Sequence, residues 1–250
     1  MLCVDGQLGE ADRAYVAMFV HRKGVCIHLR KTALIAGASG LVGSELLQIL
    51  LKKEVYDRVI AIVRRSLGIK HPKLVEAVCD FDRLDEMEGS LFEVDDVFCC
   101  LGTTIKKAKS KPAMYKIDVE YPLTIARLAC EQGARHYLLI SAMNANSKSP
   151  FFYPKIKGIL EEKVQVEPYE AISIFRPSLL LGDRKEFRFG ENLAIKMFRA
   201  ISPLLKDSWK SGMAIEAIAV AQAMYNAAQL SGNGTAIYDA RAIETLAKHS

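Results

Sequence analysis

Residues 32–54 read TALIAGASGLVGSELLQILLKKE, which is an apolar run, then a glycine-rich turn, then an amphipathic stretch. The run has the near-continuous apolarity of a strand that is buried on both faces. Residues 44–54 carry apolar side chains at helical spacing. Between them Gly37, Gly40 and Gly43 follow the spacing Gly-x-x-Gly-x-x-Gly. This order predicts a strand, a tight turn and a helix, the opening unit of an α/β fold.

The same alternation continues to the end of the chain. Further helices are predicted at residues 121–133 and 155–165. Further strands are predicted at residues 58–63, 74–79, 96–102, 135–141, 171–177 and 235–240. Residues 32–250 are therefore expected to form one α/β domain, a doubly wound parallel sheet of the Rossmann type with right-handed crossovers.

Residues 1–31 form an N-terminal extension to which the sequence assigns no role. Their longest apolar run, residues 14–20, is too short to span a bilayer. A secretory signal would need a basic start and a longer apolar region, so secretion is not expected.

The composition indicates which binding partners and which cellular compartment to expect. A net charge of +5 over 250 residues is mild. Nucleic-acid binding would need clustered basic residues together with a matching fold, so it is not expected. The six cysteines have no Cys-x-x-Cys spacing and the histidines are dispersed, which favours reduced thiols, a cytoplasmic protein and no zinc site. The apolar helix expected within residues 208–228 suits a core or a subunit contact better than a membrane surface, and it allows a homodimer.

Each glycine of the turn has a physical role in binding a dinucleotide. One makes the tight turn, one lets backbone N–H groups approach a pyrophosphate, and one lets the helix pack close to the strand. The helix N-terminus adds a positive partial charge that faces the phosphates. The alternative is a glycine-rich turn without a ligand. The residues expected to contact the cofactor here are Gly37, Ser39, Gly40, Leu41, Val42 and Gly43.

The end of the second strand indicates which dinucleotide binds. Sites that prefer NAD usually place an acidic residue there for the ribose 2′-hydroxyl. This chain has Arg64 and Arg65 instead, and a guanidinium can bind a 2′-phosphate with two hydrogen bonds. NADP(H) is therefore predicted over NAD(H); the alternative is two solvated arginines. Asp80, at the end of the third strand, is placed to accept from the adenine amino group or to cap a turn.

Three residues at or after the end of the fifth strand are candidates for catalysis. Tyr153 and Lys157 stand four apart, close to one face of a helix, although such a pair also arises by chance on a surface. Ser141 ends the fifth strand twelve residues earlier, where chemistry belongs in a parallel sheet. The order Ser, Tyr, Lys at this place favours a catalytic site.

Several motifs in the right order carry a resemblance to a known superfamily. GASGLVG, the Ser–Tyr–Lys set and FRPSLLLG resemble the short-chain dehydrogenase/reductase superfamily in its atypical or extended, epimerase/dehydratase-like branch, over residues 32 to about 248. FCCLGTT (98–104), YPKIKG, FRPSLLLGDR (175–184) and DSW (207–209) look closer still to the Tat-interacting-protein-like oxidoreductases.

The resemblance implies a role for each residue. Tyr153 would be the general acid/base, and Lys157 would favour its phenolate and bind the nicotinamide-ribose hydroxyls. Ser141 would hydrogen-bond the substrate oxygen and orient it. Pro177 and the backbone after it would meet the carboxamide. The residues that would pass beside the cofactor ribose are Leu101, Gly102, Thr103 and Thr104.

Two positions depart from the pattern of the superfamily. Pro154 follows Tyr153, and this predicts a helix that starts at residue 154 with the tyrosine at its cap. Asp118 stands where many relatives have an Asn, and we expect it to be a structural cap and not a catalytic residue.

The predicted function is an NADPH-dependent oxidoreductase that transfers hydride to or from a carbonyl or alcohol. The region left for substrate, residues 142–152 and mainly 178–215, is short, so a small or hydrophobic compound fits better than a nucleotide sugar. The main alternative is an NADPH-binding regulatory or scaffold protein with little or no turnover. A third possibility is a flavin or quinone reductase that depends on the nicotinamide alone.

Overall fold

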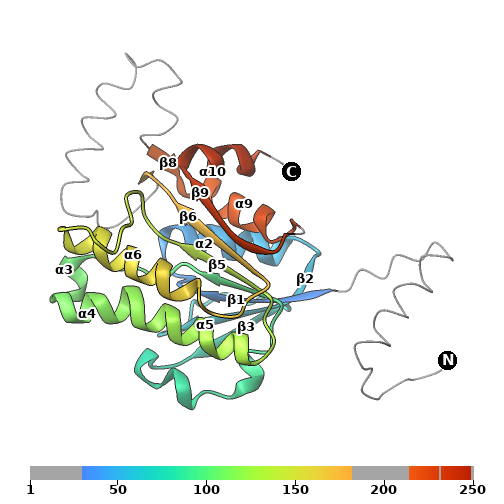
Figure 1. Ribbon diagram of the computed structural model, residues 1–250. Coiled ribbons are helices and arrows are strands. Elements are labelled where there is room, and N and C mark those ends of the chain that lie inside the picture. Colours follow the sequence, from blue (N-terminus) through green and yellow to red (C-terminus); the bar gives the residue numbers. More distant parts are fainter. Residues whose placement is uncertain (1–29, 182–213, 231, 249–250) are drawn as a thin grey trace, which may run out of the picture. The chain divides into compact units, whose positions relative to one another are not determined.

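The protein is described from a computed structural model, which describes residues 30–181, 214–230 and 232–248. Seven parallel strands of this part of the chain form one sheet in the order β3-β2-β1-β4-β5-β6-β9 (Figure 1). The strands are β1 (Lys31–Ala36), β2 (Tyr56–Val63), β3 (Leu74–Val78), β4 (Asp96–Cys99), β5 (His136–Ile140), β6 (Ala171–Arg176) and β9 (Gly234–Asp239). All seven predicted strands are present, and the doubly wound parallel sheet is confirmed.

Helices cover both faces of the sheet (Figure 1). One layer contains α2 (Leu41–Lys52), α9 (Ala217–Ala227) and α10 (Ala240–Ala247), and its apolar side chains form one core cluster with the sheet. The other layer contains α4 (Lys111–Tyr115), α5 (Tyr121–Glu131) and α6 (Phe152–Val164), which form the second cluster. Because both faces are covered, strand residues such as Leu34 and Ile35 are fully buried on opposite sides, which explains the continuous apolar runs.

Some elements were not predicted. The short helix α3 (Ile105–Ala108), α4 and the π-helix η3 (Lys116–Glu120) lie in a lysine-rich segment without a long apolar period. Two short strands, β7 (Leu179–Leu181) and β8 (Ala214–Glu216), pair in parallel at the two ends of the predicted substrate region. Residues 182–213 of that region, and residues 1–29 of the N-terminal extension, lie outside the described residues. None of the helices in the described ranges is long and apolar enough to cross a membrane.

The strand order reverses between β1 and β4, which lie side by side at the centre of the sheet. The connections from these two strands leave in opposite directions, and this opens a crevice beyond their carboxyl ends. In open α/β sheets ligands bind at such a switch point. The turn after β1 and the segment after β4 are therefore the places to look for a site.

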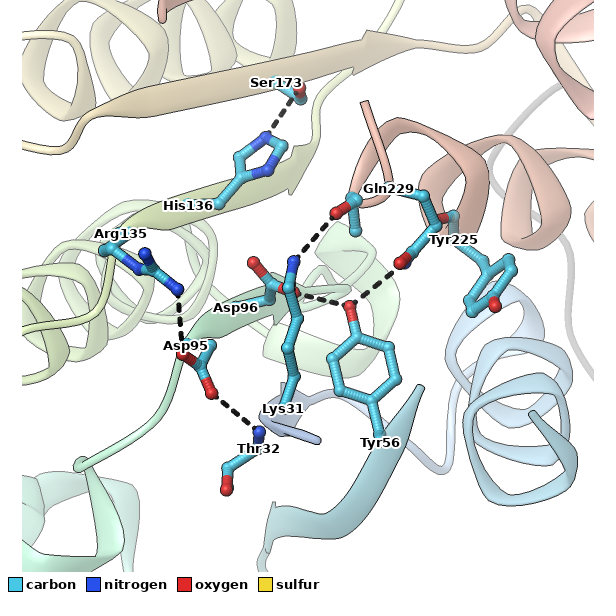
Figure 2. Close-up of polar contacts among 11 residues, drawn as sticks. Lys31, Thr32, Tyr56, Asp95, Asp96, Arg135, His136, Ser173, Tyr225 and Gln229 are labelled. Carbon is cyan, nitrogen blue, oxygen red and sulfur yellow. Dashed lines mark hydrogen bonds and ion pairs between the residues drawn. The ribbon is translucent and has the colours of Figure 1, made fainter. Parts of the chain in front are cut away.

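A buried polar cluster joins the strands at their opposite, amino ends (Figure 2). Asp96, at the start of β4, accepts from Lys31 Nζ at 3.0 Å and from Tyr56 Oη at 2.6 Å. Lys31 also donates to the carbonyl of Ala228 at 3.1 Å, at the C-terminal end of α9, where a cation is favourable. Burial, and secondarily the Asp96 charge, raises the pKa of Tyr56 well above its ordinary value. One carboxylate therefore ties β1, β2 and β4 together.

We predict that Asp96→Asn lowers the free energy of unfolding by about 2 kcal/mol. The cost is below the ~3–5 kcal/mol of a fully buried broken pair, because Lys31 keeps some contact with solvent. Urea unfolding measures it, with Arg135→Gln as the control. That change removes only the exposed Arg135–Asp95 pair and should cost about 0–1 kcal/mol. Equal effects of the two changes would contradict a central role for Asp96.

Candidate functional site

The glycine turn brings strand, turn and helix closer together than any other residue would allow. Gly37 has φ +87°, and a Cβ on it would lie 2.6 Å from the carbonyl carbon of Cys100. A Cβ on Gly43 would lie 2.1 Å from the Gly37 carbonyl oxygen. The predicted tight turn and the predicted close approach of the helix are therefore both present.

The N-terminus of α2 faces the crevice. Gly40 is its N-cap residue and has no side chain with which to cap it. The first N–H groups of a helix have no intrahelical partner, and together with the helix dipole they favour an anion. Ser39 and Gly40 are exposed, so the outside of the turn is open to a phosphate group.

A cavity lies beyond the carboxyl ends of β1, β4, β5 and β6. It brings together residues that are far apart in the sequence, from the turn before α2 to Leu180 in β7. Predicted site residues that line it are Gly40, Leu41, Val42, Leu101, Gly102, Ser141, Lys157 and Pro177. Ala142, Ser178 and Leu180, which also line it, belong to the predicted substrate region. Lining residues that the sequence did not indicate are Cys100 and Ile140. Tyr153 is not among the described residues that form this wall.

The residues predicted for the adenosine end of the cofactor lie at the neighbouring strand ends. Arg64 and Arg65 directly follow β2 and are exposed. Asp80, after β3, accepts from the Asp82 N–H at 3.0 Å and caps the short helix Phe81–Glu86. This hydrogen bond is the one expected if Asp80 caps a turn. Contact of Asp80 with adenine stays a prediction.

Helix α6 carries both Tyr153 and Lys157, but it begins earlier than predicted. Its N-cap is Phe151 and its first residue is Phe152, so the prediction that Tyr153 would be the cap is wrong. Pro154 fits because the first N–H groups of a helix need no intrahelical acceptor. Lys157 is 1 % exposed, whereas Tyr153 is partly buried.

Close contact also fixes α6 against the segment that follows β5. A Cβ on Gly158 would lie 2.1 Å from the Ser147 nitrogen and 2.3 Å from the Asn146 carbonyl carbon. Asn146 in turn donates its N–H to the Pro154 carbonyl at 3.0 Å. The backbone of the predicted substrate segment therefore rests directly on the helix that carries Lys157.

Ser141 belongs to a polar network that the sequence did not indicate. Its hydroxyl donates to the carboxylate of Glu161, which is 3 % exposed. Arg176 binds the same carboxylate through Nε at 3.1 Å and through its terminal nitrogen at 2.5 Å, and this hydrogen bonding raises the pKa of the guanidinium. Because an ionised carboxylate only accepts, the Ser141 proton points toward Glu161 and the lone pairs remain for the cavity.

Asp118 is not the helix cap that was predicted. It lies within η3, is fully buried, and accepts the Thr103 N–H at 2.7 Å through Oδ1. Its Oδ2 lies 3.7 Å from Lys157 Nζ. The residues that cap helices in this segment are Thr104, whose side chain accepts from the Lys107 N–H at the start of α3, and Ser110, whose side chain accepts from the Ala113 N–H at the start of α4.

The two thiols beside the cavity are not activated. Burial raises the pKa of both Cys99 and Cys100, which keeps them as neutral thiols. Within the described ranges, no group of three or more His, Cys, Asp or Glu residues gathers in a way that could hold a metal ion.

The profile of a family described as NAD(P)H-binding matches residues 37–171, more than half of the chain. The chain belongs to this NAD(P)H-binding family. Protein HTATIP2 of Rattus norvegicus is 38% identical over 207 residues, which are 82% of this chain and 84% of that protein. The protein named fmp52, mitochondrial, of Aspergillus fumigatus is 34% identical over 199 residues, 77% of this chain and 85% of that protein. The predicted resemblance is confirmed.

Solved structures of NAD-bound enzymes share the fold of this NAD(P)H-binding chain. WbmH of Bordetella bronchiseptica, in complex with NAD+, has a TM-score of 0.64 at 16% identity and covers 84% of this chain and 76% of its own. The UDP-glucuronic acid 4-epimerase of Bacillus cereus, with UDP-glucuronic acid and NAD, has a TM-score of 0.61 at 17% identity, over 83% of this chain and 76% of its own. At this identity the likeness extends to the fold alone.

One prediction from composition needs correction. Dispersed cysteines favoured a cytoplasmic protein, but the fungal relatives of Aspergillus fumigatus and Candida albicans are both named as mitochondrial proteins. A reduced thiol content is equally compatible with other reducing compartments, so cysteine spacing could not decide the location.

We predict that Gly43→Ala lowers the free energy of unfolding by about 1–3 kcal/mol, because the new methyl group forces α2 away from the turn. Gly89→Ala is the matched control. Its Cβ would meet side-chain atoms of Gln132 no closer than 3.6 Å, so a change within about 0.5 kcal/mol is expected. Urea unfolding compares the two variants; similar values would contradict the close contact at Gly43.

Proposed function

We propose that the chain is an NADPH-dependent oxidoreductase that transfers hydride between the nicotinamide and a small carbonyl or alcohol substrate. The observation that carries this proposal is the shared cavity. The cavity is lined from four different strand ends, by the turn residues Gly40 to Val42, the segment Leu101–Gly102, Ser141 and Pro177. Lys157 lines it from helix α6. A nucleotide that lay along this wall would bring its nicotinamide beside Ser141 and Lys157.

The proposed chemistry assigns one task to each side chain. When bound, the cofactor supplies or accepts the hydride. Lys157 holds the nicotinamide ribose through its ammonium group, and Pro177 meets the carboxamide with the backbone that follows it. Tyr153 moves the proton at the substrate oxygen, with Lys157 one helical turn away favouring its phenolate. Ser141 contacts the same oxygen.

The preference for NADPH is part of the proposal. Arg64 and Arg65 are exposed at the end of β2, where a 2′-phosphate would lie in this fold. Both guanidinium groups are open to solvent, so they can turn toward a phosphate without leaving a buried partner. Asp80 would accept from the adenine amino group while it keeps its turn-capping bond, since a carboxylate has several acceptor positions.

A regulatory or scaffold protein that binds NADPH with little turnover is the second candidate. Two observations favour it. Tyr153 does not line the described cavity, and the Ser141 proton is directed to Glu161 and away from a substrate oxygen. For turnover, Tyr153 would have to approach the cavity when the cofactor and substrate bind, and catalytic hydrogen bonds often form only at that stage.

We expect the double change Arg64→Ala with Arg65→Ala to raise the Kd of NADPH about 10- to 100-fold, because one or two charge-assisted bonds to the 2′-phosphate are lost. The Kd of NADH, which lacks this phosphate, should change less than about twofold. Fluorescence titration with both nucleotides measures the effect. An equal loss for NADH and NADPH would mean that the arginines do not select the cofactor.

Tyr153→Phe separates the enzymatic candidates. If Tyr153 is the general acid/base, kcat for a carbonyl substrate found by screening should fall about 10²- to 10⁴-fold, while the Kd of NADPH stays within about twofold. Unchanged turnover would favour a reductase that depends on the nicotinamide alone. NADPH binding without any turnover by the wild type, over a broad carbonyl and alcohol screen, would favour the regulatory protein.

A further inference from the structure

The contact between Asp118 and Lys157 has an unusual geometry for a buried ion pair. The side chains are 0% and 2% exposed, yet Asp118 Oδ2 lies 3.7 Å from Lys157 Nζ. This distance is too long for an N–H···O hydrogen bond. Among the described residues Oδ2 has no hydrogen-bond partner, whereas Oδ1 accepts the Thr103 N–H at 2.7 Å. The two charges are therefore paired without a bond that directs the ammonium protons.

Stability alone does not explain this arrangement. A buried ammonium group is strongly disfavoured unless an opposite charge is close, and Asp118 is the opposite charge beside Lys157. A shorter contact would satisfy both groups better, since an orphaned buried oxygen carries a desolvation cost. An orphaned polar atom of this kind needs an explanation, and one is that Lys157 keeps its N–H groups for a ligand and not for Oδ2. Lys157, which lines the cavity, is the member of the pair that a ligand can reach.

The same carboxylate also holds the opposite wall of the cavity. Thr103 directly follows Leu101 and Gly102, which line the cavity on the β4 side, and its N–H is bound to Asp118. Lys157 lines the cavity from α6. Asp118 lies behind both elements and sets their separation. It is thus placed to control how a nucleotide fits between them.

We infer that Asp118 is a positioning residue for the dinucleotide: it is the counter-ion that keeps Lys157 charged at the cavity wall and leaves the ammonium N–H groups to the ribose hydroxyls. This inference rests on the proposed function, in which Lys157 binds the ribose. Asp118 itself does not touch the cavity. Its effect passes through Lys157 on one side and through Thr103 on the other.

The other groups near Lys157 leave the negative charge to Asp118. From β4, the Cys99 thiol interacts with the charges of both Lys157 and Asp118, but burial raises its pKa and keeps it neutral. On α6, the residue one turn before Lys157 is Tyr153, the proposed acid/base, and not a carboxylate. Glu161, one turn after it, is bound to Arg176 and Ser141.

The test uses Asp118→Asn in the full chain. Asparagine is nearly isosteric and keeps an acceptor for the Thr103 N–H, but it removes the charge. A buried ammonium without a counter-charge gives up its proton more readily, so it stays charged at low pH and is lost as the pH rises. We expect NADPH to bind the variant with a Kd within about twofold of the wild type at pH 6 and about tenfold weaker at pH 9.

Two further variants serve as controls. Asp57→Asn removes an exposed carboxylate at the start of β2 and should follow the wild type at every pH. Lys157→Met removes the ammonium itself, so this variant should bind NADPH weakly. Between pH 6 and pH 9 its Kd should change no more than the Kd of the wild type does. The double change Asp118→Asn with Lys157→Met leaves no unpaired buried charge, and its thermal midpoint should lie above that of either single variant.

The outcomes separate this inference from the proposed function. If the wild type binds NADPH and Asp118→Asn shows the same affinity as the wild type at both pH values, Asp118 only anchors Thr103 and the inference is overturned. If Asp118→Asn binds weakly and equally so at pH 6 and pH 9, it acts through structure and not through the charge of Lys157, which also overturns the inference. If the wild type does not bind NADPH, the proposed function fails and the positioning role fails with it. A higher thermal midpoint of the double variant than of either single variant would then still show that Asp118 and Lys157 form an ion pair.

Discussion

The fold depends on one place where three pieces of backbone meet with no room for a side chain. The Gly37 carbonyl lies against α2 at Gly43, and the Gly37 α-carbon lies against the backbone of Cys100 at the end of β4. This contact sets the angle at which α2 leaves the sheet, and with it the position of the helix N-terminus beyond the strand ends. The same contact holds the β1 turn close to the segment after β4. The cavity exists because these two connections diverge from such a close crossing.

The buried charged groups at the two ends of the sheet differ in how completely they are hydrogen-bonded. At the amino ends, Asp96 forms short hydrogen bonds with Lys31 and Tyr56, which leave its Oδ2 well satisfied and join three strands. At the carboxyl ends, Asp118 and Lys157 are equally buried but remain 3.7 Å apart. The first arrangement is that of a structural cluster, in which each donor has found its acceptor. In the second arrangement the Lys157 N–H groups are not bound to Asp118. Binding sites often leave polar groups unsatisfied in this way, at a cost in stability.

Much of this could be predicted from sequence because strands buried on both faces and glycines without space for a Cβ leave strong local patterns. The seven strands and the turn at Gly37 follow from such patterns. The roles of Asp118 and Glu161 could not be predicted, because each depends on a partner that is distant in the chain and is brought near only by the crossovers. Helix α6 starts earlier than predicted, because its first turn tolerates a proline even though the residue before a proline usually avoids helical angles. The cytoplasmic location was wrongly predicted because cysteine spacing indicates the redox state of the thiols and does not indicate the cellular compartment.

The contact at Gly158 has a mechanical consequence. Because the backbone at Asn146 and Ser147 rests on α6 without an intervening side chain, the segment after β5 and the helix that carries Lys157 must shift together. If the proposed function holds, a bulky substrate that displaced this segment would also displace the Lys157 ammonium from the nucleotide. The proposed function therefore implies that substrate size and cofactor geometry are coupled. A change of specificity is easier to achieve from the other side of the cavity, near Ser178 and Leu180, than through the segment that is seated on the helix.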